Sequence, residues 1–138
     1  MNKKSQKGFS LIEVLIAMTI LVIGILAVGG MQTTAVKNNA IGRRITEASA
    51  LAASQLEFLT TLPYNDPLLN DRNGDGTTGL DKTDAQADFN ITQGQYSISW
   101  NVALDSPISN TKNIRVIVTW TDGGKSRRVS FNCIKAPY

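Results

Sequence analysis

A long apolar run near the N-terminus constrains the fold of this chain more than any other feature. Residues 11–31 contain sixteen apolar residues, three glycines, one threonine and a single acid, Glu13. A helix of that length, at ~1.5 Å per residue, spans roughly 30 Å, the thickness of a hydrocarbon core. The run is longer than the ~7–15 apolar residues of a secretory signal peptide. It predicts a membrane-spanning helix that keeps Lys3, Lys4 and Lys7 on the cytoplasmic side.

The carboxylate of Glu13 near the start of this run has three explanations. It is a tolerated charge close to the membrane interface, or an acid favoured by the helix macrodipole at an N-terminus, or a charge that finds its partner only on assembly. The second explanation is compatible with the other two. Because ionisable groups inside membrane segments are costly, such a residue is a functional hypothesis that requires a named partner.

The composition excludes several classes of function. The chain has no histidine and one cysteine, Cys133, which rules out Ser-His and Cys-His catalysis and an internal disulfide. The net charge is +3 and falls to zero when residues 1–8, with their three lysines, are set aside. The basic character therefore belongs to that short segment, and neither an enzyme nor a nucleic-acid-binding protein is predicted.

The helix is expected to continue beyond the apolar run. Residues 32–62 contain no proline, and their apolar positions recur at steps of three or four, which indicates one face of a helix. These positions are Ile41, Ile45, Ala48, Ala52, Leu56, Leu59 and Leu62. We expect one helix from about Ser10 to Leu62, roughly 80 Å long. Its second half is amphipathic and is predicted to lay its apolar face on a globular head.

The remaining residues predict a small sheet after a polar loop. Pro63 and Pro67 end the helix, and residues 63–94 are expected to form a loop because turn-forming residues dominate them. Residues 95–138 contain three stretches of alternating apolar and polar residues, typical of half-buried strands. Asp122–Gly123–Gly124–Lys125 between the last two predicts a hairpin. The expected fold class is α+β: a long N-terminal helix packed on a three-stranded antiparallel sheet.

Some side chains of the predicted sheet have an expected location. Trp100 and Trp120 are in phase with the apolar face, so we expect them in the core rather than in a ligand site. Cys133 shares that alternation and is expected to be a buried, inert thiol. Arg127 and Arg128 close the hairpin and are expected to be solvated or in surface ion pairs.

The polar loop carries a partial calcium-binding pattern. Asp71, Asn73 and Asp75 alternate and are followed by Gly76, as at the start of an EF-hand loop. The twelfth position, where that template has a bidentate glutamate, is Lys82. Two interpretations stay open: a solvated turn without metal, or a Ca²⁺ site. The latter would be formed by Asp71, Asn73, Asp75, the Thr77 carbonyl and Asp81. Ca²⁺ is the only cofactor the sequence suggests.

The stretch KGFSLIEVLIA, residues 7–17, resembles the cleavage and methylation motif of type IV prepilins and pseudopilins. The resemblance implies that a prepilin peptidase cuts between Gly8 and Phe9 and that Phe9 becomes N-methylated. It also implies that Glu13 meets the N-terminal ammonium of a neighbouring subunit. By this resemblance the chain divides into five segments: a leader (1–8), a transmembrane half-helix (9–31), an amphipathic half-helix (32–62), a loop (63–94) and a sheet (95–138).

Within that family the chain is most similar to PilV-like minor pilins. It lacks the second cysteine needed for a C-terminal disulfide and has no proline in its membrane segment, unlike many major pilins. The resemblance implies a subunit of the inner membrane, with its N-terminus in the cytoplasm, that primes or caps a surface pilus. Its implied partners are other pilins, the prepilin peptidase and the assembly platform. Two alternatives stay open: a pseudopilin of a type II secretion system, and a membrane-tethered domain without a filament role.

Overall fold

The computed structural model describes residues 8–137, which form two compact units. One long helix, α1 (Leu11–Thr61), runs through both, and the division falls between Ala40 and Ile41. The second unit adds four strands and three short 3₁₀ helices. The strands are β1 (Phe89–Gln93), β2 (Tyr96–Leu104), β3 (Lys112–Asp122) and β4 (Lys125–Lys135), and the 3₁₀ helices are η1 (Pro67–Leu69), η2 (Gly76–Thr78) and η3 (Asp84–Gln86).

In the first unit, α1 exposes its apolar side chains on all sides. Leu11, Leu21 and Leu26 are each more than 60 % exposed, and the other large apolar residues up to Val36 are similarly uncovered. By length and composition, α1 is the one described helix that can cross a membrane. Because such a surface is unfavourable in water, this half of the helix requires lipid or other helices around it.

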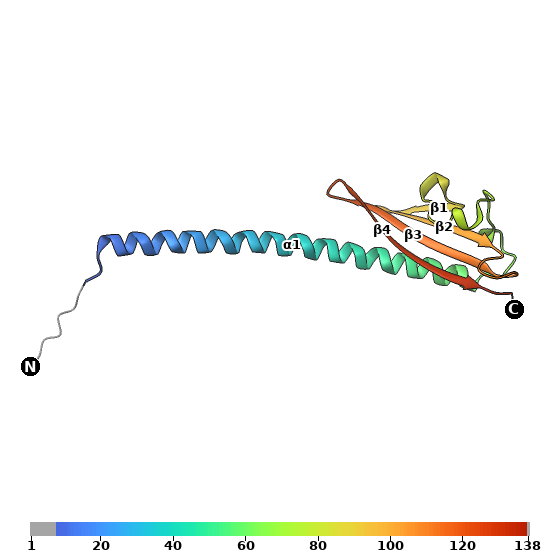
Figure 1. The fold of residues 1–138 in the computed structure, drawn as a ribbon, viewed down its shortest axis with the longest axis horizontal. Coiled ribbons are helices and arrows are strands. Elements are labelled where there is room, and N and C mark those ends of the chain that lie inside the picture. The colour runs from blue at the N-terminus through green and yellow to red at the C-terminus, as the bar shows by residue number, and fades with distance from the viewer. Residues whose placement is uncertain (1–7, 138) are drawn as a thin grey trace, which may run out of the picture. The chain divides into compact units, whose positions relative to one another are not determined.

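In the second unit, the last part of α1 packs on one face of the sheet (Figure 1). Ala48, Ala52 and Leu59 are fully buried, which confirms the predicted helix face, whereas Ile45 remains 41 % exposed. The sheet supplies the other side of this core through Tyr96, Ile98, Trp100, Val102, Ile114, Val116, Val118 and Trp120. Both tryptophans are only 4 % exposed, so their predicted place in the core is confirmed.

The sheet has four antiparallel strands in the order β1-β2-β3-β4, so the prediction of three strands was wrong. The additional strand, β1, lies within residues 63–94, which were expected to be a loop. Its sequence, FNITQ, has only two apolar residues and gives a weak strand pattern. Its pairing with β2, from Phe89 opposite Trp100 to Gln93 opposite Tyr96, is what makes it a strand. The rings of Phe89 and Trp100 stack at 5.0 Å.

Over β2, the other face of the sheet is covered by the polar segment that precedes β1. Asn101 and Ser99, both fully buried on β2, hold this segment through hydrogen bonds. The side-chain amide of Asn101 donates to the carbonyls of Leu80 and Lys82, at 3.2 and 2.8 Å, and the Ser99 hydroxyl accepts from the amide of Asp84. This part of the loop is therefore packed on the sheet as a layer of the fold.

The side chains of β4 are less covered than expected. Phe131 faces the helix side of the sheet but is 39 % exposed, and Cys133 is half-buried rather than buried. Burial nevertheless raises the pKa of the Cys133 thiol, which keeps it protonated and poorly nucleophilic. Arg128 is exposed, as predicted, and Arg127 lies 3.8 Å from the carboxylate of Asp122.

Candidate functional site

The residues around the predicted cleavage point precede the helix. Gly8, Phe9 and Ser10 have no regular secondary structure and are exposed, with Phe9 83 % accessible. The helix begins at Leu11. An exposed, non-helical segment is the form of chain that proteases cut most readily. The basic residues of the expected leader, Lys3, Lys4 and Lys7, lie outside the described residues.

Glu13 lies in the first turn of α1, where its charge complements the helix dipole. Its backbone amide donates to the carbonyl of Ser10 at 3.0 Å. Phe9, Glu13, Ala17 and Leu21 recur at every fourth position and line one shallow groove on the helix surface. Among residues 8–137, no lysine or arginine forms an ion pair with Glu13. The carboxylate therefore sits in an apolar groove and has no cationic partner within the described part of its own chain.

The predicted calcium ligands Asp71 and Asn73 serve the loop itself. The two carboxylate oxygens of Asp71 accept from the amides of Gly74 and Gly76, at 2.7 and 2.9 Å. The side-chain oxygen of Asn73 accepts from the amide of Asp75 at 3.1 Å. These contacts form the hydrogen-bonded turn that was the alternative to a metal site. Gly74 and Gly76 have φ of +71° and +57°, which a residue with Cβ adopts only at a cost.

The other predicted ligands point to different partners. The Asp75 side chain lies against Gly79, where an added Cβ would be 1.6 Å from the Asp75 Oδ1. Asp81 forms an ion pair with Arg115 of β3 at 2.7 Å. Thr77 is exposed in η2. Within residues 8–137, no three acidic or cysteine side chains are grouped as metal ligands. Calcium binding stays a prediction for direct measurement.

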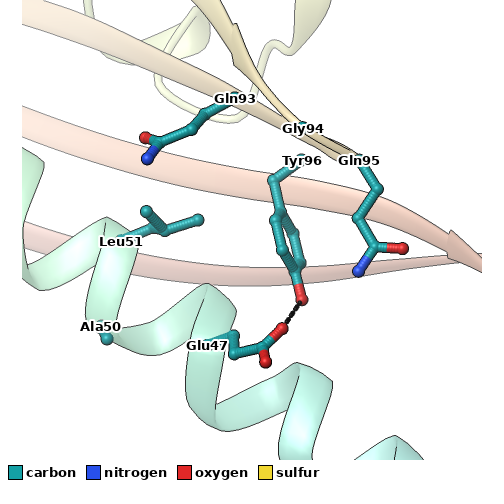
Figure 2. A pocket seen from close by; sticks show the side chains of 7 residues that line it. All are labelled: Glu47, Ala50, Leu51, Gln93, Gly94, Gln95 and Tyr96. Atoms are coloured by element: carbon teal, nitrogen blue, oxygen red, sulfur yellow. Dashed lines mark hydrogen bonds between the residues drawn. The ribbon is translucent and has the colours of Figure 1, made fainter.

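A second hollow lies between α1 and the β1–β2 turn, within the second unit (Figure 2). Figure 2 shows the Tyr96 hydroxyl pointing at the carboxylate of Glu47, to which it donates a hydrogen bond of 2.8 Å. This bond, and a second from Arg43, lower the pKa of Glu47. Burial, with the Glu47 bond, raises the pKa of Tyr96. The contact joins helix to sheet, and no sequence pattern pointed to it.

Another residue that the sequence did not single out is Asp88, just before β1. It is 5 % exposed, and its carboxylate accepts from the amides of Arg72, Asn73 and Val102 at 2.8–3.3 Å. It thereby fastens the polar loop to β2. A single Asp before a weak strand pattern gives no such signal, because its three donors are 14 to 16 residues away in the chain.

The comparisons with known proteins agree with the N-terminal geometry. Residues 3–29 match the family model described as "Prokaryotic N-terminal methylation motif". This match covers the predicted cleavage point, Glu13 and most of the apolar run. No curated protein and no solved structure matched the chain.

The motif and the fold support the same conclusion. The motif lies where a short exposed segment meets an apolar helix, and that helix continues into a unit with an antiparallel sheet. The chain therefore carries the N-terminal methylation motif on a pilin-like α+β fold, and its N-terminal helix is long and apolar enough to cross a membrane.

Proposed function

We propose that this protein is a minor type IV pilin, a structural subunit that helps to prime or cap a pilus. In this proposal the chain enters the inner membrane through the apolar half of α1, and prepilin peptidase cuts between Gly8 and Phe9. The new N-terminal residue, Phe9, is N-methylated. The mature subunit then joins other pilins at the assembly platform and leaves the membrane with the filament.

The observation that carries the proposal is Glu13, an acid in an apolar groove without a cationic partner in the described residues of its own chain. Cleavage after Gly8 creates an ammonium group on Phe9. Where apolar helices bundle and water is excluded, a carboxylate is tolerated only if it is paired and hydrogen-bonded. The ammonium of a neighbouring subunit supplies that pairing, and it fixes the axial position at which subunits dock.

The first test is the mass of the N-terminal peptide, measured on protein purified from its native membrane. We expect a chain that begins at Phe9 and carries one additional methyl group. Gly8→Leu should block cleavage, because the peptidase requires a small residue at the cut. A native chain that retains residues 1–8, or that begins at another residue, would exclude the proposal.

The second test is incorporation into filaments. Glu13→Ala should leave membrane insertion and cleavage intact and reduce recovery of the protein in sheared filaments by about tenfold or more, as expected if ~1.4 kcal/mol of docking energy is lost. Glu57→Ala, which removes an exposed acid from the same helix, is the matched control and should incorporate normally. Equal incorporation of both variants would contradict the pairing.

The alternative function is a pseudopilin of a type II secretion system, which would share processing and helix packing. The single cysteine and the absence of proline in residues 9–31 favour the minor pilin over a major one but do not separate it from a pseudopilin. Deletion of the gene distinguishes the two. Loss of surface pili with normal secretion supports the pilin, whereas loss of exoprotein secretion with normal pili supports the pseudopilin.

A further inference from the structure

Strand β4 presents a long unpaired edge. It is the last strand of the sheet and has 11 residues, Lys125–Lys135, all paired with β3 on one side only. Within residues 8–137, no backbone hydrogen bond joins its other side to any segment. Such an edge offers a row of amide and carbonyl groups to another strand.

The hairpin register identifies the groups on that row. Gly123 and Gly124, at φ of +57° and +77°, form a two-residue turn closed by Asp122 and Lys125. The closing pair of such a turn exchanges both hydrogen bonds, and every second pair along the ladder does the same. The odd-numbered residues of β4 therefore bond to β3. The amides and carbonyls of the even-numbered residues, all exposed, point outward: Ser126, Arg128, Ser130, Asn132 and Ile134.

The opposite edge of the sheet is β1, and the same argument applies to it. Its turn to β2 has two residues, Gly94 and Gln95, and is closed by Gln93 and Tyr96. The residues with outward backbone groups are then Asn90 and Thr92, both exposed. In this antiparallel order, β1 and β4 run in opposite directions. When a second copy lies beside the first in the same orientation, its β1 therefore runs antiparallel to β4 of the first copy.

The charges of the two edges decide which pairing is favourable. Strand β4 carries Lys125, Arg127, Arg128 and Lys135 and no acid, so two β4 strands repel each other. Strand β1 carries no charged residue, and of the five aspartates in the preceding residues 70–88, Asp88 is buried and Asp81 pairs with Arg115. Asp84 of this segment lies beside β1 on the outer face of the sheet, where its carboxylate accepts from the Ser97 hydroxyl at 2.8 Å. The side chains of the even-numbered residues of β4, including Arg128, lie on that same face of the sheet.

We propose that the β4 edge of one copy pairs with the β1 edge of a second copy, which extends the sheet from head to head. The contact joins two different surfaces, so it can repeat from copy to copy, and it gives a linear assembly when the rotation between copies does not close a ring. This inference goes beyond the proposed function, because it concerns the head and applies equally to a pilin or a pseudopilin. The edge pairing is a β-strand addition in which backbone bonds supply affinity and the opposite charges supply direction.

Cysteine cross-linking of the full-length protein in detergent tests the pairing. Both copies carry Cys133→Ser; one has Ser130→Cys on β4, and the other, with a different tag, has Thr92→Cys on β1. A short bis-maleimide should give the mixed dimer in large excess over either product from one variant alone. Ser109→Cys, at an exposed loop position, is the control for chance contact within a micelle.

Two further variants separate strand pairing from other contacts. Asn132→Pro removes an outward amide without touching the bonds to β3, and it should lower the mixed product about tenfold, whereas Asn132→Ala should not. Arg128→Glu should also lower the yield of the mixed dimer. Added salt should lower the yield obtained without this substitution. A circular dichroism spectrum confirms that each variant is folded.

The outcomes are distinct. A mixed product at the level of the Ser109→Cys control, or a dominant product from two Ser130→Cys chains, overturns the proposal. Insensitivity of the mixed product to Asn132→Pro in a folded chain overturns it too. Failure of the N-terminal processing test leaves this cross-link unaffected, so the two proposals can fail separately.

Discussion

At the scale of single residues, the carboxylate of Asp88 joins the polar loop to β2, although no sequence motif pointed to it. It accepts three backbone hydrogen bonds, and its own amide donates to the side-chain oxygen of Asn101 at 3.0 Å. A buried carboxylate is costly unless such donors surround it. Here the donors come from the loop and from β2, so one side chain joins two layers of the fold.

Replacement of Asp88 should therefore be strongly destabilising. Asp88→Ala leaves buried amides without acceptors, and we expect the free energy of unfolding to fall by about 2–4 kcal/mol. Asp88→Asn keeps one acceptor oxygen and should cost less. Denaturant unfolding measures both, and limited proteolysis should show residues 70–88 cut first in the alanine variant. Equal stability of Asp88→Ala and wild type would refute this role.

The hydrogen bond between Tyr96 and Glu47 predicts a dependence on pH. Since the folded-state pKa of Glu47 lies below its ordinary value of 4.5, the unfolded chain binds more protons as the pH falls through this region. The stabilisation is therefore complete above pH 4.5 and is lost as the pH drops through the folded pKa. Tyr96→Phe should be less stable than wild type at pH 7, and the difference should shrink toward pH 3. A stability difference between Tyr96→Phe and wild type that does not change with pH would show that the hydroxyl does not act through the ionisation of Glu47.

At the scale of elements, two buried lysines hold the end of α1 and the segment that follows it. Lys112 and Lys135 face each other across β3 and β4 and are 4 % and 5 % exposed. The ammonium of Lys135 donates to the carbonyl of Thr60 at 2.6 Å, and that of Lys112 to those of Tyr64 and Leu69 at 2.8 and 2.7 Å. Lys135 lies at the C-terminus of α1, where a cation satisfies a carbonyl that lacks a partner and complements the helix dipole.

This arrangement predicts an unusual pH effect for Lys112. Burial lowers its pKa below the ordinary 10.5, opposed by Asp66 and reinforced by Lys135. Between the two pKa values the unfolded state binds the proton that the folded state has lost, so stability rises with pH there. Lys112→Met should cost about 1–3 kcal/mol at pH 7. The stability difference from wild type should widen toward pH 10; a narrowing difference would contradict the argument.

Calcium binding by the polar loop, residues 63–94, can be measured directly. Both carboxylate oxygens of Asp71 already accept backbone hydrogen bonds, so we expect calorimetry of the full chain in detergent to show no heat of Ca²⁺ binding at micromolar concentrations, the range of EF-hand sensors. Asp71→Ala should lower stability by about 1 kcal/mol through the lost turn contacts. A clear binding heat that this variant abolishes would instead establish the calcium site.

At the scale of the whole molecule, the two units require different surroundings for their apolar side chains. All residues of the buried core, from Ala48 to Trp120, lie in the second unit, whereas the large apolar side chains of the first unit are exposed. Water drives the folding of the former, and lipid or neighbouring helices must cover the latter.

A core mutation should therefore separate folding from membrane anchoring. Leu59→Ala removes a fully buried side chain and should cost about 2–5 kcal/mol. Because the anchor lies in residues 11–31, the variant should sediment with membranes as wild type does, while its head unfolds at a lower denaturant concentration. Phe58→Ala, a half-exposed neighbour, is the control and should unfold near the wild-type midpoint. Loss of membrane association by Leu59→Ala would contradict this division.

The structure also shows where local sequence patterns are sufficient. The alternation in β2 and β3 predicted the face that packs on the helix, but not the burial of Ala103 and Ile117 on the opposite face. Strand β1 was missed, since a five-residue strand with two apolar residues is specified by its partner β2 and not by its own pattern. The buried roles of Asp88 and Lys112 were missed for the same reason: a polar side chain is buried only where distant backbone groups satisfy it.

The sequence by itself determined the anchor, the helix and the processing motif, because hydrophobicity, helical period and a contiguous motif are all local properties. Only the tertiary structure decided the fourth strand, the loop that covers part of the sheet, the two buried lysines and the two free edges of the sheet. Each of these depends on groups that are far apart in the chain and meet only when it folds, and no local pattern encodes such a meeting.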